Sequence, residues 1–145
     1  VVGVSTLYHL AAKGWDDSIL LERKSLTSGS TWHAAGLLPL FNMSYSVGQI
    51  HKYSVRFYQE LQDETGMDVG FRKVSNIRLA STQDRMDEYL QYKGVADTIG
   101  VEVKVLSPQE IKDCWPLVST ENLIGAIQHP EDGYIQQADL TQAYA

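Results

Sequence analysis

Hydrophobic residues recur along the chain with two periods, one typical of helices and one typical of strands. The predicted helices share apolar side chains spaced three to four residues apart, and they cover residues 1–13, 46–65 and 84–99. The predicted strands are short runs, continuously apolar or alternating, and they cover residues 18–21, 74–80, 101–106 and 123–128. This alternation of helices and strands predicts an α/β or α+β architecture.

The first two elements predict part of a parallel sheet. The helix over residues 1–13 ends at Gly14, a polar turn follows, and residues 18–21 form a continuously apolar strand. Strands of this kind are typical of parallel sheets that are buried on both faces. We therefore expect the second half of a βαβ unit at the start of the chain.

The later elements indicate a more antiparallel region. In residues 101–106 valines alternate with charged residues, so Val101, Val103 and Val105 are expected on one face of a strand, and Glu102 and Lys104 on the other. Ser107 and Glu110 have the spacing of a capping box and predict the start of a short helix. Asp139 is expected to cap a last helix.

The charge balance argues against several kinds of partner. The chain has 12 Lys and Arg against 18 Asp and Glu, a formal net charge of −6 and a pI of about 5.1. A nucleic-acid interface needs a basic face, and binding to an anionic membrane needs a polybasic segment, so we predict neither partner. No run reaches the roughly 20 apolar residues that a membrane span requires.

Cysteine and histidine usage argues against disulfides and metals. The single cysteine, Cys114, excludes an internal disulfide framework. His9, His51 and His129 are scattered without the spacing of metal ligands, so no metal site is predicted.

One candidate motif joins a glycine to an acidic residue. Gly3 stands at the start of the first helix, and Glu22 follows 19 positions later at the end of the predicted strand. Dinucleotide folds use a glycine at this place so that helix and strand can pack closely. They also use an acidic residue about 20 positions on, which accepts hydrogen bonds from ribose hydroxyls. A helix-start glycine and a surface glutamate explain the same spacing equally well.

A second candidate motif is the loop of small residues over 29–36, which also holds Trp32 and His33. Small hydroxyl side chains and exposed backbone amides suit a pyrophosphate. His33 could serve there as an acid or base, a ligand or a nucleophile. The residues alone favour a plain hydrogen-bonded loop histidine.

Three runs resemble the start of the dimethylglycine and sarcosine dehydrogenases, which are flavoproteins of the D-amino-acid-oxidase-like (DAO) superfamily. These runs are Val-Val-Gly-Val-Ser at 1–5, Leu-Leu-Glu-Arg at 20–23 and Gly-Ser-Thr-Trp-His-Ala-Ala-Gly-Leu at 29–37. The similarity continues through residues 64–66, 77–80, 85–89, 115–117 and 129–135, so it covers essentially the whole chain. The Ser-Thr-Trp-His run is the most specific part of it.

The resemblance implies a domain order. We expect an α/β fold with a partial FAD/NAD(P)-binding Rossmann-like domain over residues 1–43, followed by the start of an α+β substrate domain over residues 44–145. We also expect a fragment of a longer oxidoreductase, in which the first strand and the first two fingerprint glycines precede Val1. The 145 residues alone are expected to hold FAD poorly, because the missing strand would be central in the sheet.

The resemblance also implies the cofactor. His33 matches a histidine that is joined covalently to the 8α-methyl group of FAD in the family. The residues that it assigns to FAD binding are Val1, Val2, Gly3, Glu22, Arg23, Gly29, Ser30, Thr31, Trp32, His33, Ala34, Ala35, Gly36 and Leu37.

The implied reaction is oxidative N-demethylation of a small methylated amine such as dimethylglycine or sarcosine. In the family a hydride leaves an N-methyl group, and the iminium is hydrolysed or passes its one-carbon unit to tetrahydrofolate in a separate C-terminal domain. The catalytic residues, the particular amine and the electron acceptor stay open. The implied compartment is the mitochondrial matrix in a eukaryote and the cytoplasm in a bacterium.

Two other hypotheses fit part of the sequence. A non-catalytic relative that regulates pyruvate dehydrogenase phosphatase keeps the fold but lacks the Trp-His pair. An NAD-dependent dehydrogenase would account for Gly3 and Glu22 alone. A set of tyrosines at helical spacing is expected in the core or at its rim rather than in an amine-binding cage, namely Tyr45, Tyr53, Tyr58, Tyr89 and Tyr92.

Overall fold

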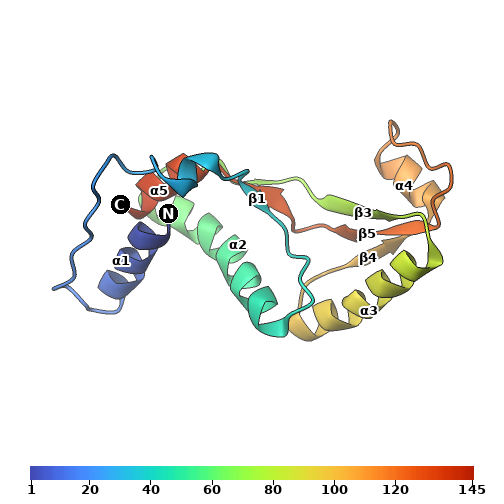
Figure 1. Cartoon of the computed structure of the whole chain (residues 1–145), viewed down its shortest axis with the longest axis horizontal. Coiled ribbons are helices and arrows are strands. Elements are labelled where there is room, and N and C mark those ends of the chain that lie inside the picture. Colours follow the sequence, from blue (N-terminus) through green and yellow to red (C-terminus); the bar gives the residue numbers. More distant parts are fainter. The chain divides into compact units, whose positions relative to one another are not determined.

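Helices and strands alternate along the chain, as the hydrophobic pattern predicts (Figure 1). The computed structural model describes residues 1–145, which form two compact units. Unit 1 comprises Val1–Leu37, Val55–Arg72 and Tyr134–Ala145, and unit 2 comprises Leu38–Ser54 and Lys73–Gly133. Each unit is made of separate stretches of the chain, whereas the expected domains follow one another with a boundary near residue 43. The compact units do not test that domain boundary, which stays a prediction.

Unit 1 is built mainly from helices. It contains α1 (Val2–Ala12), the short 3₁₀ helix η1 (Ser30–His33), α5 (Gln137–Tyr144) and the second half of α2 (Tyr45–Thr65). Aromatic side chains join three of them, because Phe57 of α2 stacks on Tyr144 of α5 and Tyr8 of α1 meets both rings edge-on. The helical predictions for 1–13 and 46–65 are confirmed to within a residue at each end.

The predicted strand over residues 18–21 is wrong. This segment has no ladder partner, and Ile19 and Leu21 are 84% and 89% exposed. Leu20 alone packs inward, against Gly3 at the start of α1. A strand exists through its hydrogen-bonded neighbours, and no other segment of the chain lies beside this one to form a ladder.

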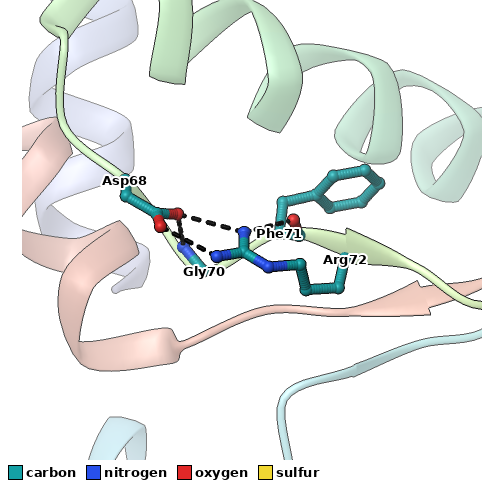
Figure 2. Close-up of polar contacts among 4 residues, drawn as sticks. All are labelled: Asp68, Gly70, Phe71 and Arg72. Carbon is teal, nitrogen blue, oxygen red and sulfur yellow. Dashed lines mark hydrogen bonds and ion pairs between the residues drawn. The ribbon is translucent and has the colours of Figure 1, made fainter.

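A turn over residues 68–72 ends the second stretch of unit 1, where β2 (Arg72–Lys73) begins. Figure 2 shows the Asp68 carboxylate accepting hydrogen bonds from the Gly70 N–H at 2.7 Å and from both terminal nitrogens of Arg72 at 2.9 and 3.2 Å. Arg72 also donates to the Phe71 carbonyl at 2.8 Å. These bonds from Arg72 and Gly70 lower the pKa of Asp68.

Unit 2 is a three-stranded antiparallel sheet with helices packed on it. The strand order is β3 (Asn76–Ala80), β5 (Gly125–His129), β4 (Lys104–Leu106). Helix α3 (Gln83–Ile99) runs along the sheet, and α4 (Pro108–Cys114) packs on β4 and β5 (Figure 1). The predicted strands near 74–80 and 123–128 and the predicted helix over 84–99 are confirmed.

The boundaries in unit 2 follow local chemistry. Ser107 and Glu110 form the predicted capping box, with reciprocal side-chain bonds to the backbone. On the α4 side of the sheet, Leu106 and Ala126 form an apolar cluster with Ile111. Val101 and Val103 are both buried, but Val105 points away from this cluster and is 40% exposed, so the prediction of one face for all three valines is wrong at Val105.

The remaining strands are very short. β1 (Leu37–Leu38), β6 (Gly133–Tyr134) and β2 form a second sheet in the order β1-β6-β2. Helix α5 begins at Gln137 with Gln136 as its N-cap, so Asp139 lies in the first turn and is not the predicted cap. An acidic side chain in that turn still favours the helix through its dipole. None of the helices is both long and apolar enough to cross a membrane.

Candidate cofactor site

A cavity of about 430 Å³ lies in unit 1 at the start of α1. It combines the helix start, the segment after α1, the loop around η1 and one residue of α5. The lining residues are Val1, Val2, Gly3, Val4, Leu20, Glu22, Leu26, Thr27, Gly29, Ser30, Thr31, Ala34 and Thr141.

The start of α1 gives this cavity an electropositive wall. The first hydrogen bond within the helix runs from the Ser5 N–H to the Val1 carbonyl at 3.0 Å, so the N–H groups of residues 2–4 have no acceptor in the helix. Val1 is the N-cap, no side chain caps the helix, and the first turn holds no acidic residue. A helix start in this condition attracts an anionic group.

Gly3 allows the helix to lie close to the following segment. A Cβ at this position would lie 2.9 Å from Leu20 Cδ1, a contact that a larger residue could not make without a shift. The close approach brings Glu22 to the same cavity. Glu22 Oε1 accepts the Lys24 N–H at 2.9 Å, which orients the carboxylate. Gly3 and Glu22, which are 19 positions apart in the sequence, therefore lie at the same cavity.

The loop over residues 27–36 forms the opposite wall. Thr27 has a positive φ of 72°, and its carbonyl accepts the Trp32 N–H at 3.1 Å. Thr31 Oγ1 accepts a hydrogen bond at 2.7 Å from the N-terminal ammonium group of Val1. Small side chains leave the backbone of this wall accessible.

The cavity gathers only part of the predicted set. The predicted residues that line it are Val1, Val2, Gly3, Glu22, Gly29, Ser30, Thr31 and Ala34. The predicted residues outside its lining are Arg23, Trp32, His33, Ala35, Gly36 and Leu37. His33 is the last residue of η1 and is exposed, and the neighbouring Trp32 is 66% exposed.

Some lining residues have no signal in the sequence. Thr141 is almost fully buried in α5, where its hydroxyl donates to the Gln137 carbonyl at 2.7 Å. It reaches the cavity because α5 packs against both α1 and η1. Thr27 lies within the loop of small residues that the sequence predicts over 24–36, but two residues before the candidate motif over 29–36.

Unit 2 holds a separate cluster of buried polar side chains. Asp132, His129 and Tyr92 are all at most 2% exposed, and Arg78 and His51 lie near enough to influence Asp132. Burial raises the pKa of Asp132 to about 6, although Arg78, His51 and the Leu40 N–H oppose the shift.

Burial acts on the other two members of this cluster in the directions expected for their charges. It lowers the pKa of His129 to about 4, helped by the positive charge of Arg78. It raises the pKa of Tyr92 to about 12. Both side chains are therefore neutral near pH 7. No group of three His, Cys, Asp or Glu side chains is placed to hold a metal ion.

An open helix start, a glycine packed on the next segment and an acidic residue at the same cavity are typical of dinucleotide-binding proteins. The comparison with known families is more specific. The chain belongs to the DAO family of FAD dependent oxidoreductases, whose model matches residues 1–145.

Relatives match along nearly the whole chain. Mitochondrial dimethylglycine dehydrogenase of Rattus norvegicus is 40% identical over 144 residues, and mitochondrial sarcosine dehydrogenase of Homo sapiens is 39% identical over 138 residues. The mitochondrial pyruvate dehydrogenase phosphatase regulatory subunit of Mus musculus is 34% identical over 145 residues. The matches cover 99%, 94% and 100% of this chain but only 17%, 15% and 16% of the relatives.

A solved structure supports the fold. The L-proline dehydrogenase of P. horikoshii superposes with a TM-score of 0.88 at 23% identity, over 99% of this chain and 38% of the other. The predicted fold class and family resemblance are confirmed.

Proposed function

We propose that the full-length protein binds FAD at the unit 1 cavity and oxidises a small N-methylated amine, such as dimethylglycine or sarcosine. The observation that carries the proposal is the cavity itself, where an uncapped helix start, Gly3 against Leu20, and Glu22 converge. The family match and the names of the two dehydrogenase relatives support the reaction class.

The lining residues fit the parts of FAD. The N–H groups of residues 2–4 would hold the pyrophosphate, because they lack acceptors within the helix. Glu22, with Arg23 beside it in sequence, would hold the adenosine ribose through its hydroxyls. The small residues from Gly29 to Leu37 would let the chain approach the flavin closely. A Cβ at Gly3 would disturb this arrangement.

FAD, when bound, would accept the hydride that leaves the N-methyl carbon. The oxidised amine would then be hydrolysed, or would pass its one-carbon unit to tetrahydrofolate elsewhere in the full-length protein. The two dehydrogenase relatives named above are mitochondrial, so the proposed compartment is the mitochondrial matrix if the source is a eukaryote. For a bacterial source the proposed compartment is the cytoplasm.

We assign the covalent attachment of FAD to His33. A neutral imidazole nitrogen is a nucleophile, and His33 is exposed and able to reach a partner outside the loop. The bond would join that nitrogen to the 8α-methyl carbon of FAD, in place of the imidazole N–H hydrogen and one methyl hydrogen. Dissolved dioxygen would accept the two electrons and the two protons and become hydrogen peroxide.

A denaturing gel of the full-length protein tests this assignment. The band is expected to fluoresce under ultraviolet light after acid treatment, and the His33→Ala band is expected to stay dark. Ser28→Ala is the matched control, because Ser28 lies outside the cavity lining and its hydroxyl bonds only the Ser25 carbonyl. A dark wild-type band would favour the non-catalytic alternative, and a fluorescent His33→Ala band would place the link elsewhere.

A further inference from the structure

A turn in unit 1, just before η1, holds a threonine in an unusual backbone conformation. The Ser28 N–H donates to the Ser25 carbonyl at 3.2 Å, so residues 25–28 form a turn with Thr27 in third place. Thr27 has a φ of 72°. A positive φ at this place in a turn favours glycine or asparagine. A residue branched at Cβ, such as threonine, is a genuine outlier there.

The backbone bonds of this turn do not require a threonine. The Thr27 carbonyl accepts the Trp32 N–H at 3.1 Å, which joins the turn to η1. A glycine at position 27 could make the same backbone bonds without the conformational cost. Residues that break a local rule of this kind, and strained backbone in general, are concentrated at functional sites. The side chain of Thr27 is therefore the feature that needs an explanation.

That side chain has no hydrogen-bond partner within the protein. The hydroxyl side chains at the unit 1 cavity are those of Thr27, Ser30, Thr31 and Thr141. Thr141 gives its proton to the Gln137 carbonyl, and Thr31 Oγ1 accepts from the N-terminal ammonium group. No hydrogen bond joins the hydroxyl of Thr27 or Ser30 to another group of the chain. Ser30 already belongs to the residues that the resemblance assigns to FAD, whereas Thr27 does not.

The lining of the cavity indicates which part of FAD would meet Thr27. The start of α1 suits a pyrophosphate, and the Glu22 carboxylate suits a ribose. His33, the proposed point of flavin attachment, lies outside the lining, as does Trp32 beside it. The cavity therefore suits the ADP half of FAD. A hydroxyl that donates to a phosphate oxygen makes a charge-assisted hydrogen bond, which is stronger than a bond between neutral groups.

We propose that the Thr27 hydroxyl donates a hydrogen bond to the pyrophosphate of FAD, and that the left-handed conformation is retained because it presents this hydroxyl at the cavity. The proposal rests on the proposed function. The N–H groups at the start of α1 and the Thr27 hydroxyl would then hold the pyrophosphate from opposite walls. Thr27 is a binding residue in this arrangement and takes no part in the transfer of hydride.

Binding of ADP to the full-length apoprotein, expressed in a host starved of riboflavin, tests the proposal. ADP carries the adenosine and the pyrophosphate of FAD but has no flavin to attach, so calorimetric titration gives an equilibrium Kd. Thr27→Val removes the hydroxyl and keeps a branched Cβ, so the backbone cost is unchanged. The Kd for ADP is expected to rise about tenfold, the scale of a lost hydrogen bond to a charged group. Thr27→Ser keeps the hydroxyl and is expected to bind ADP as the wild type does.

Thr27→Gly is expected to change stability and affinity in opposite directions. Glycine adopts a positive φ without steric cost, so the urea midpoint of the apoprotein is expected to rise. The Kd for ADP is expected to rise as well, as in Thr27→Val, because the hydroxyl is lost. A midpoint at or below that of the wild type would contradict a conformation that is retained for binding.

Ser28→Ala is the matched control. The Ser28 hydroxyl donates to the Ser25 carbonyl at 2.8 Å in the same turn, and Ser28 lies outside the cavity lining. This variant loses a hydrogen bond of the turn but no proposed contact with the ligand, so its Kd for ADP is expected to match the wild type. Equal losses of affinity in Ser28→Ala and Thr27→Val would show a general effect of the turn and overturn the proposal.

Two further results would overturn the proposal while the proposed function stands. The first is an unchanged Kd in Thr27→Val when the wild type binds ADP. The second is an equal loss of affinity for adenosine, which has no phosphate and would place the hydroxyl at the ribose. A wild-type apoprotein that binds neither ADP nor FAD would contradict the proposed function itself, and this proposal with it.

Discussion

Asp132 is a buried carboxyl group whose ionisation opposes folding. Its pKa rises from 3.8 to about 6 on burial, so its stabilising contribution is present at acid pH and is lost as the pH rises through 6. The shift of about two pH units corresponds to about 3 kcal/mol at 1.36 kcal/mol per unit. In the full-length protein, Asp132→Asn is therefore expected to gain stability relative to wild type by up to about that amount between pH 4 and pH 7.

Urea unfolding at several pH values measures this difference. His129 titrates in the opposite sense, because its lowered pKa gives stability that is present above pH 6.5 and lost as the pH falls through about 4. Subtracting the wild-type profile from the variant profile removes that contribution, since both proteins keep His129. A difference that does not change with pH would contradict the buried, high-pKa state of Asp132.

Residues with a local signal could be predicted, and residues that act through distant contacts could not. Gly3 and Glu22 are related by a fixed spacing, and both line the cavity. Thr141 reaches the same cavity only because α5 packs on η1, which no local pattern encodes. Tyr92 was expected at the core or its rim, but its hydrogen bond to Leu40 depends on a chain separation of 52 residues.

At the scale of elements, the residue just before β1 must be glycine for two reasons, its backbone conformation and its close contact with a neighbouring backbone. Its φ is +71°, and a Cβ would lie 2.3 Å from the Ile135 carbonyl oxygen. The left-handed conformation alone costs a non-glycine residue about 1–2 kcal/mol. The contact with backbone adds about 1–3 kcal/mol, because the neighbouring chain must move. Gly36→Ala is expected to lower the free energy of unfolding by more than about 2 kcal/mol, measured in urea.

Gly66 provides the comparison for this prediction. It has nearly the same φ, +68°, but a Cβ there would meet nothing within 4 Å. Gly66→Ala is expected to show only the conformational cost of about 1–2 kcal/mol. Equal losses in the two variants would mean that the close contact between Gly36 and Ile135 does not contribute.

Helices could be predicted more accurately than strands because their hydrogen bonds are local. The side-chain period alone predicts the helices over 1–13, 46–65 and 84–99, and the structure confirms each one. Residues 18–21 have an equally clear apolar pattern but no partner strand, so here the pattern predicts a strand that does not form. Helix α5 begins at Gln137, two residues before Asp139, and its N-cap is Gln136. The Gln136 side chain makes no capping hydrogen bond, so no capping residue in the sequence marks this helix start.

At the scale of the whole molecule, the segment over residues 18–22 is the clearest site for self-association of the 145-residue chain. Ile19 and Leu21 are 84% and 89% exposed, and their backbone has no ladder partner. Exposed apolar side chains beside unpaired backbone groups favour pairing between copies. The chain is therefore expected to form oligomers as its concentration rises, and Leu21→Lys is expected to shift it to the monomer.

Ile50→Lys is the control, because Ile50 is 63% exposed but its backbone is bonded within α2. Light scattering during gel filtration gives the mass of each species, and an equal shift in both variants, or a wild-type monomer at every concentration, would contradict association through this segment.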